Sequence, residues 1–260
     1  MQWLNSVAGL GVGMMVGMTG VGGGALMTPI LVLLFGVAPA AAVGTDLWFA
    51  AITKLAGGAV HHRQGSVDWQ VLRRLCAGSL PASLATLAWL HFSGIAQTKS
   101  GFILTALGSV LLLTAVAMVF KRQTHALGQA LRSTAPESFK RAQPALTVVA
   151  GAILGFLVTL TSVGAGALGA VMLVYLYPFR MTPARLVGTD IVHAIPLTIV
   201  AGTGHLLMGN VNPTLLGALL LGSIPGIVLG SLIGNRAPEH VLRGAIALVL
   251  ALVGVKLVMA

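Results

Sequence analysis

The stretch that decides the fold is TGVGGGAL at Thr19–Leu26, because it occurs a second time as TSVGAGAL at Thr161–Leu168. The tripeptide Gly-Thr-Asp follows both copies and ends at Asp46 and at Asp190. The copies lie 142 residues apart at the glycine motif and 144 apart at the tripeptide, so two residues were inserted between them. A duplicated apolar chain that is broken by glycine at matching positions is typical of a transporter whose binding site lies between the halves.

The composition indicates an integral membrane protein. The chain is 57% hydrophobic and only 8% charged, whereas soluble domains carry about 25% charged residues. Its mean hydropathy is +0.97, and apolar runs of roughly 20 residues, the length of a membrane crossing, recur along it. The net charge of +10 sits at the ends of these runs, as the positive-inside rule expects, so it does not indicate a nucleic-acid partner. The single Cys76 excludes an internal disulfide, and the sequence predicts no metal site and no cofactor.

The chain divides into a first membrane repeat (residues 1–120), a polar linker (121–144) and a second membrane repeat (145–260). Each repeat begins with an apolar segment that its glycine motif interrupts, and three transmembrane helices are predicted to follow. The interrupted segments are 7–36 and 145–177, and the predicted helices are 40–60, 71–92, 100–120, 183–208, 213–235 and 240–259.

Charge counts predict how each interrupted segment meets the membrane. Each side of the break offers about 13 residues, which is short of the roughly 20 needed to cross and suits a re-entrant hairpin. With single crossings the basic residues divide 9 to 5 between the two sides, leaving Lys54 out. With hairpins they divide 12 to 2, and only Lys99 and Lys256 stay opposite. The positive-inside rule favours the second arrangement.

This arrangement gives an all-α integral membrane fold of two inverted repeats. Each repeat is a re-entrant or broken helical hairpin plus three transmembrane helices. An odd number of crossings per repeat inverts the second repeat relative to the first. The central linker is then cytoplasmic, and both termini lie outside.

The glycine breaks are predicted to bind an anionic substrate. The helix that restarts after each break directs its first N–H groups and its positive dipole end at the break. Glycine lets an anion approach that backbone closely, and neighbouring hydroxyls add donors. The predicted substrate-binding residues are Thr19, Gly22, Gly23, Gly24, Thr45, Thr161, Ser162, Gly164, Gly166 and Thr189.

Close helix packing is the alternative role for these glycines. We favour packing for Gly9, Gly13 and Gly17, which recur at a spacing of four residues. We favour the binding site for the two duplicated glycine breaks.

Four ionisable residues lie within predicted spans, namely Asp46, Lys54, Asp190 and His193. Intramembrane acids are costly and normally face a cavity, so these four are predicted to act in proton coupling or as counter-ions. Two roles remain open for the acids. They carry protons that are coupled to transport, or each caps a helix or bonds the backbone of a neighbouring hairpin. Lys54 is either a counter-ion to Asp46 or a direct contact of the anion.

The sequence VGGGALMTPIL at Val21–Leu31, followed by Gly44-Thr45, resembles the TauE/SafE group of sulfite and organosulfonate exporters. The resemblance covers essentially the whole chain. It implies export of small sulfur-containing anions, such as sulfite or sulfoacetate, across a bacterial-type inner membrane. It also implies that an ion gradient drives transport and that the protein lies in a lipid bilayer. A homodimer is compatible with the resemblance. The chain departs from the group's pattern by carrying Asp after Gly-Thr in both halves, and by Val171 where the first copy has Pro29.

A secondary transporter that is not an enzyme is therefore the predicted function. A passive anion channel is one alternative, because sequence does not separate a channel from a porter. An intramembrane enzyme that uses Asp46 and Asp190 as an acid–base pair is a second alternative. The duplication disfavours it, since catalytic sites seldom need each group twice.

Overall fold

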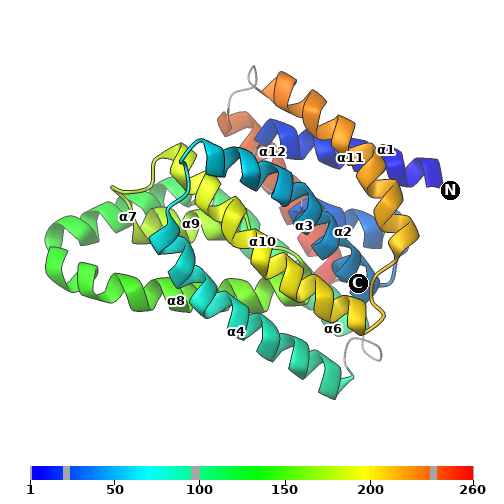
Figure 1. Ribbon diagram of the computed structural model, residues 1–260, viewed down its shortest axis with the longest axis horizontal. Helices are drawn as coiled ribbons and strands as arrows, with labels where there is room; N and C mark the ends of the chain where they lie inside the picture. Colours follow the sequence, from blue (N-terminus) through cyan, green and yellow to red (C-terminus); the bar gives the residue numbers. More distant parts are fainter. Residues whose placement is uncertain (1, 20–23, 95–99, 235–238, 260) are drawn as a thin grey trace.

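The computed structural model describes residues 2–19, 24–94, 100–234 and 239–259, and within these ranges every regular element is an α-helix (Figure 1). The first half comprises α1 (Gln2–Thr19), α2 (Gly24–Leu33), α3 (Pro39–Arg63), α4 (Trp69–Ser93) and α6 (Ser100–Val119). The remainder comprises α7 (Lys121–Thr134), α8 (Pro136–Thr161), α9 (Ala167–Leu176), α10 (Pro183–Leu207), α11 (Pro213–Gly234) and α12 (Glu239–Val258).

The protein is a multi-pass membrane protein. Among the described residues, five helices are long and apolar enough to cross a bilayer, namely α4, α6, α8, α10 and α11. Large apolar side chains are exposed on the outside of the bundle, for example Leu84, Leu221 and Leu252. A lipid environment accounts for this exposure, because in hydrocarbon such side chains need no burial. The all-helical membrane class predicted from composition is confirmed.

The helices begin close to the predicted positions. Pro39, Pro183 and Pro213 open α3, α10 and α11, where the missing proline N–H costs no helical hydrogen bond. The expectation of about 13 residues on each side of the glycine breaks was wrong. The helices before the breaks have 18 and 26 residues, and those after them have 10 each.

The long helix α8 explains part of this difference. It begins at Pro136, inside the stretch assigned to the linker, and continues through residue 145 without interruption. Proline at the first helical position and Glu137 in the first turn both favour a helix start there. The linker is therefore helical, formed by α7 and the first turns of α8.

The helices pair across the two halves, α1 with α11 and α4 with α8. Glycines bring the paired backbones into contact. A Cβ atom on Gly13 would overlap the backbone of Ser223, and one on Gly155 would overlap the backbone of Ser79. Gly13 and Gly155 occupy equivalent positions in the two repeats, as do Ser79 and Ser223. The same relation holds for Gly9 and Gly151, and for Gly78 and Gly222.

The packing role predicted for Gly9 and Gly13 is confirmed, because small residues let membrane helices approach closely. The surroundings of Gly17 lie outside the described residues.

The pair α3 and α10 occupies the middle of the molecule, between the α1–α11 pair and the α4–α8 pair (Figure 1). The backbone N–H of Asn212, in the loop after α10, donates to Thr45 Oγ1 near the start of α3 at 3.1 Å. The backbone N–H of Asp68, in the loop after α3, donates to Thr189 Oγ1 near the start of α10 at 2.9 Å. The start of each helix therefore lies beside the end of the other, so α3 and α10 are antiparallel.

The segment formed by α8 and α9 is a hairpin. Gln143, near the start of α8, donates from Nε2 to the carbonyl oxygen of Leu176 at the end of α9. The hydroxyls of Thr147 and Tyr177 lie 2.8 Å apart. The chain therefore reverses at the break between the two helices and returns toward the beginning of α8.

Candidate functional site

The break between α8 and α9 forms the tip of this hairpin. Ser162 has a φ of 61°, Gly164 of 124° and Gly166 of 133°. Ser162 is the one non-glycine residue with positive φ in the described part of the chain. Thr161 stabilises the turn, because its hydroxyl donates to the carbonyl of Leu157 and accepts from the N–H of Val163. A buried serine in this conformation is strained, and such strain gathers at functional sites.

The corresponding break in the first half falls between α1 and α2. The predicted residues Gly22 and Gly23 lie outside the described residues, as do the side chain of Thr19 and the surroundings of Gly24. The structure gives only the helix ends on either side, at Thr19 and at Gly24. The role of this break in substrate binding stays a prediction.

Asp46 of α3 is fully buried and lies between α2 and the tip of the α8–α9 hairpin. Thr28 Oγ1 of α2 donates to its Oδ2 at 2.5 Å. On the other side, the Ser162 hydroxyl lies within interaction range of the carboxylate. Within the described chain, Asp46 Oδ1 and Ser162 Oγ are buried without a hydrogen bond of ordinary geometry. Native proteins leave few buried polar atoms unsatisfied, and those that remain often mark functional sites.

Asp190 of α10 lies at the N-terminus of α9. The backbone N–H of Gly166 interacts with its carboxylate. A Cβ atom on Gly169 would overlap Asp190 Oδ1, so this close approach requires glycine. A carboxylate is favourable here, because the unpaired N–H groups and the helix dipole present positive charge. This geometry matches the second role considered for the acids, bonding to the hairpin backbone.

Lys54 joins the two acids into one cluster. Its side chain is buried, and Nζ donates to the carbonyl oxygen of Ala165 in the tip at 3.2 Å. Its charge acts on both Asp46 and Asp190. In the described part of the chain, neither acid lies within 4.0 Å of Lys54 Nζ as a direct ion pair. Lys54 thus donates a hydrogen bond directly to one backbone carbonyl and interacts electrostatically with two carboxylates at longer range.

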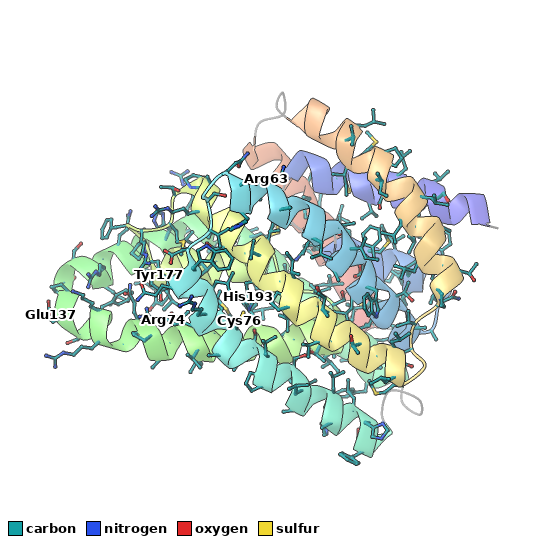
Figure 2. All side chains as sticks on the ribbon, viewed as in Figure 1. Arg63, Arg74, Cys76, Glu137, Tyr177 and His193 are labelled. Carbon is teal, nitrogen blue, oxygen red and sulfur yellow. The ribbon has the colours of Figure 1, made fainter. Side chains whose placement is uncertain are left out.

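His193 completes the cluster from α10, where its side chain is fully buried (labelled in Figure 2). Its Nε2 lies 2.9 Å from the hydroxyl of Ser79 on α4. Its Nδ1 is buried and has no hydrogen-bond partner among the described residues. The positive charge of Lys54 acts on the ring, so the two groups share one environment.

The structure therefore brings together all four predicted ionisable residues, with Ser162 and Gly166 of the second break. Thr45 and Thr189 are placed differently, since their hydroxyls accept from loop N–H groups of the opposite half. Their role in substrate binding stays a prediction.

Sequence reasoning missed Thr28 and Ser79. Thr28 lies in the motif Val21–Leu31 and could have been chosen as a hydroxyl near the break. Ser79 has no comparable signal.

Comparisons with known proteins agree with a membrane transporter. The family model described as Sulfite exporter TauE/SafE matches residues 6–257. The chain is 41% identical to the Probable membrane transporter protein YjnA of Bacillus subtilis (strain 168), over 78% of this chain and 79% of that protein. It is 26% identical to the Probable membrane transporter protein YdhB of the same organism, over 94% and 95%. No solved structure matches.

Proposed function

The chain belongs to the sulfite exporter TauE/SafE family of membrane transporters, and on this premise we propose that it exports small sulfur-containing anions such as sulfite and sulfonates. The proposal gives it the mechanism of a secondary transporter in a bacterial-type inner membrane. The single observation that carries the mechanism is the buried cluster of Asp46, Asp190 and Lys54 around the tip between α8 and α9.

The cluster contains groups that can bind an anion within the membrane. Charges inside a membrane protein are costly, so three of them at one hairpin tip indicate a functional site. The substrate anion binds at the tip, where Lys54 supplies positive charge and the start of α9 supplies N–H groups. The Ser162 hydroxyl and the ring of His193 are additional hydrogen-bonding groups of the same cluster.

Asp190 and the substrate compete for one position. The carboxylate already faces the N-terminus of α9, and a second anion there would be repelled. Protonation of Asp190 removes this negative charge and lets the substrate anion take its place beside the Gly166 N–H. The proton on Asp190 and the substrate anion then occupy the tip together, so anion flux depends on a pH gradient, and net export follows the outward gradient of the anion.

The two halves (residues 1–120 and 145–260) act as inverted repeats joined by the linker (121–144). Three features support this arrangement. Helix α3 packs antiparallel to α10, and α1 and α4 of the first half pair with α11 and α8 of the second. Helices α8 and α9 form a hairpin. Alternating access then occurs when the helix pairs that these contacts hold together, α1–α11 and α4–α8, move against one another around the cluster.

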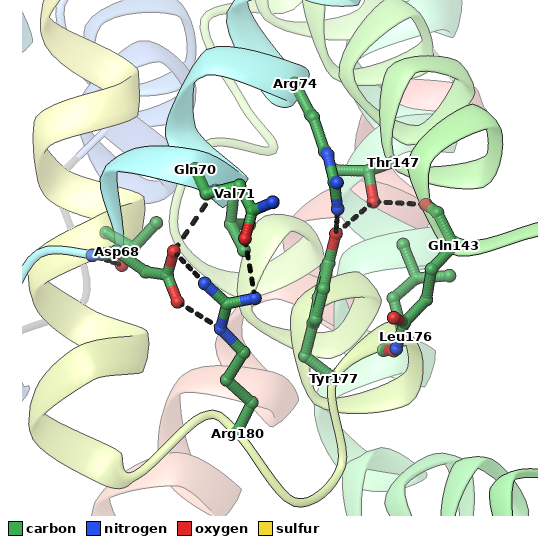
Figure 3. Close-up of polar contacts among 10 residues, drawn as sticks. Asp68, Gln70, Val71, Arg74, Gln143, Thr147, Leu176, Tyr177 and Arg180 are labelled. Carbon is green, nitrogen blue, oxygen red and sulfur yellow. Dashed lines mark hydrogen bonds and ion pairs between the residues drawn. The ribbon is translucent and has the colours of Figure 1, made fainter. Parts of the chain in front are cut away.

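The linker faces the cytoplasm and both termini lie outside, with each hairpin entering the membrane and returning to its own side. The first turns of α8 belong to the linker, so only the later part of this long helix enters the membrane. Contacts between basic regions support this orientation. Arg180 of the second half bonds Asp68 of the first, and Arg74 of the first half bonds the Tyr177 hydroxyl of the second (Figure 3). Arg74 and Arg180 therefore lie at the same end of the molecule, as the positive-inside rule expects of basic residues at the cytoplasmic end.

Flux through proteoliposomes tests the proposal. The protein is reconstituted, and the flux of sulfite and of sulfoacetate is measured with and without an imposed pH gradient. We expect flux that the gradient changes, and a loss of this dependence in Asp190→Asn. The control is Glu137→Gln, which makes the same chemical change at an exposed acid far from the cluster (Figure 2).

The alternatives give different results in the same assay. Flux that ignores the gradient in the unmodified protein indicates a passive channel. Chemical conversion of the anion without flux indicates an enzyme. Absence of flux for every sulfur anion tested would contradict the proposed substrate class.

A further inference from the structure

A second polar site lies at the corner where α7, α8 and the loop after α9 meet. It is a pocket of about 260 Å³, lined among others by Arg132 of α7, Lys140 and Gln143 of α8, and Tyr177 and Arg180 of the loop. None of these residues belongs to the buried cluster. We propose that this pocket binds a phosphate-type oxyanion, carried either by an anionic membrane lipid or by free phosphate.

The charges around the pocket are not neutralised. Within the described chain, Arg132 and Lys140 have no acidic partner within 4.0 Å. Glu137 lies one turn from Lys140 on α8 and still makes no ion pair with it. The guanidinium of Arg180 bonds Asp68 at 2.6 Å and 2.8 Å (Figure 3). The Arg132 guanidinium donates to the backbone carbonyl oxygen of Pro136, which leaves its positive charge without an acidic partner. Arg132 and Lys140 are therefore the two cations of the pocket that remain available to an anion.

Arginine and lysine are the side chains that proteins use for phosphate groups. Arginine offers a planar fork of N–H donors and lysine a compact positive charge. Arg132 and Lys140 come from two different helices, so an anion between them is contacted from two sides.

The walls of the pocket are fixed by hydrogen bonds. The Tyr177 hydroxyl bonds both Arg74 and Thr147 (Figure 3). His125 of α7 lies 2.9 Å from the carbonyl oxygen of Pro178, so α7 is attached to the loop. Gly128 of α7 packs directly on the backbone of Tyr175. The cationic side chains therefore project from elements that are already in place, which lowers the ordering cost of binding.

The rim of the pocket points to the membrane interface. Phe179, which also lines the pocket, is 68% exposed, and Leu127 and Leu131 of α7 are 55% and 37% exposed. Helix α7 thus combines basic residues with outward apolar ones, as helices that lie in the lipid interface do. Basic pockets beside transmembrane helices recognise lipid head groups by the same chemistry.

Thermal stability in detergent tests the proposal, because a ligand that binds only the folded state raises the melting temperature. The probes are inorganic phosphate, mixed micelles that contain phosphatidylglycerol, and micelles with phosphatidylcholine as the zwitterionic reference. We compare the unmodified protein with the double variant Arg132→Gln/Lys140→Gln. The control is Arg122→Gln/Arg141→Gln, which removes two positive charges from the same helices at exposed positions outside the pocket lining.

We expect a rise of about 3 °C with phosphatidylglycerol or with inorganic phosphate. The rise should disappear in Arg132→Gln/Lys140→Gln and persist in the control. A rise with phosphatidylglycerol alone identifies a lipid head group as the source, and a rise with inorganic phosphate identifies the free anion.

Two results would overturn the proposal, namely no rise with either probe and a rise that survives in Arg132→Gln/Lys140→Gln. The exchanged side chains are not buried, so both variants should fold. Their melting temperatures without probe verify this. Sulfur-anion flux by these variants is measured separately, so failure here leaves the transport proposal intact.

Discussion

The two halves of the molecule keep the same helix contacts and differ in their buried charges. Gly13 packs on Ser223 as Gly155 packs on Ser79. The loop residue Asn212 donates to Thr45 as Asp68 donates to Thr189. These contacts involve backbone atoms and small side chains, so they tolerate little change once a helix pair has formed.

The buried acids occupy equivalent positions and have different partners. Asp46 accepts a hydrogen bond from Thr28, whereas Asp190 lies against Gly166 and Gly169 of the second hairpin. The position equivalent to Thr28 is Ala170, which offers no hydroxyl.

The other two ionisable groups of the cluster each occur in one half only. Lys54 of α3 corresponds to Thr198 of α10, and His193 of α10 corresponds to Phe49 of α3. Lys54 nevertheless reaches the tip between α8 and α9, and its charge acts on the ring of His193. The two halves share the scaffold, and one lysine interacts with both acids. The described structure therefore supports one shared cluster around the second tip.

The largest effect is expected from breaking the contacts that the halves share. In Gly13→Val and in Gly155→Val the new side chain overlaps a neighbouring backbone, and each change should lower the free energy of unfolding by about 3 kcal/mol or more. Both variants should lose the monodisperse peak in size-exclusion chromatography. Gly217→Val is the control, because a Cβ atom at Gly217 has no atom within 4 Å in the described structure. If one variant of the pair folds normally, the two packing sites are not equivalent.

The next effect concerns the charge that is present in one half. Lys54→Met leaves two buried acids without their cation, and uncompensated buried charge is strongly unfavourable. We expect anion flux in proteoliposomes to fall by at least about tenfold, the equivalent of about 1.4 kcal/mol. The matched control is Thr198→Val at the equivalent position, where the hydroxyl bonds only backbone carbonyls of its own helix. Equal flux in the two variants would mean that Lys54 does not act on the anion.

A smaller effect is expected from moving Asp190 without removing it. In Gly169→Ala the new methyl group displaces the carboxylate from the start of α9. The obstacle is the end of a side chain, so the protein should fold, and flux should fall by about threefold, roughly 0.7 kcal/mol. The double variant Gly169→Ala/Asp190→Asn tests whether the two residues act together. If they do, its flux is no lower than that of Asp190→Asn alone.

Much of this architecture could be predicted from the sequence because the relevant signals are local. Apolar runs fix the helices, and proline fixes several of their starts, as at Pro39 and Pro183. Duplication identified Asp46 and Asp190 as equivalent, and their position inside apolar spans led to the prediction that they act in proton coupling or as counter-ions.

The partners of these acids could not be predicted, because they depend on which helices pack together. Nothing in the sequence around Lys54 indicates that it reaches the carbonyl of Ala165, which lies 111 residues away along the chain. The length of α8 was also not predicted. A polar stretch lacks the apolar signal for a helix, and Pro136 fits a helix start as well as a linker.

The smallest effect is expected from making a loop of the first half resemble its counterpart. Asp68 caps α4 by accepting from the N–H of Val71 and also bonds Arg180. Among the described residues, the side chain of the equivalent Asn212 caps α11 and makes no ion pair. Asp68→Asn keeps the cap, since asparagine is as good an N-cap as aspartate. It loses an ion pair whose arginine is 42% exposed. We expect the melting temperature to fall by no more than about 3 °C.

The control for the cap is Asp68→Ala, which loses both interactions and should cost about a further 1 kcal/mol. Anion flux in Asp68→Asn should stay within about twofold of the unmodified protein, or roughly 0.4 kcal/mol, because Asp68 is not part of the cluster around Lys54. A large change in flux with an unchanged melting temperature would contradict this expectation. It would mean that the contact between Asp68 and Arg180 forms and breaks during transport, and that this end of the molecule opens by separating the two loops.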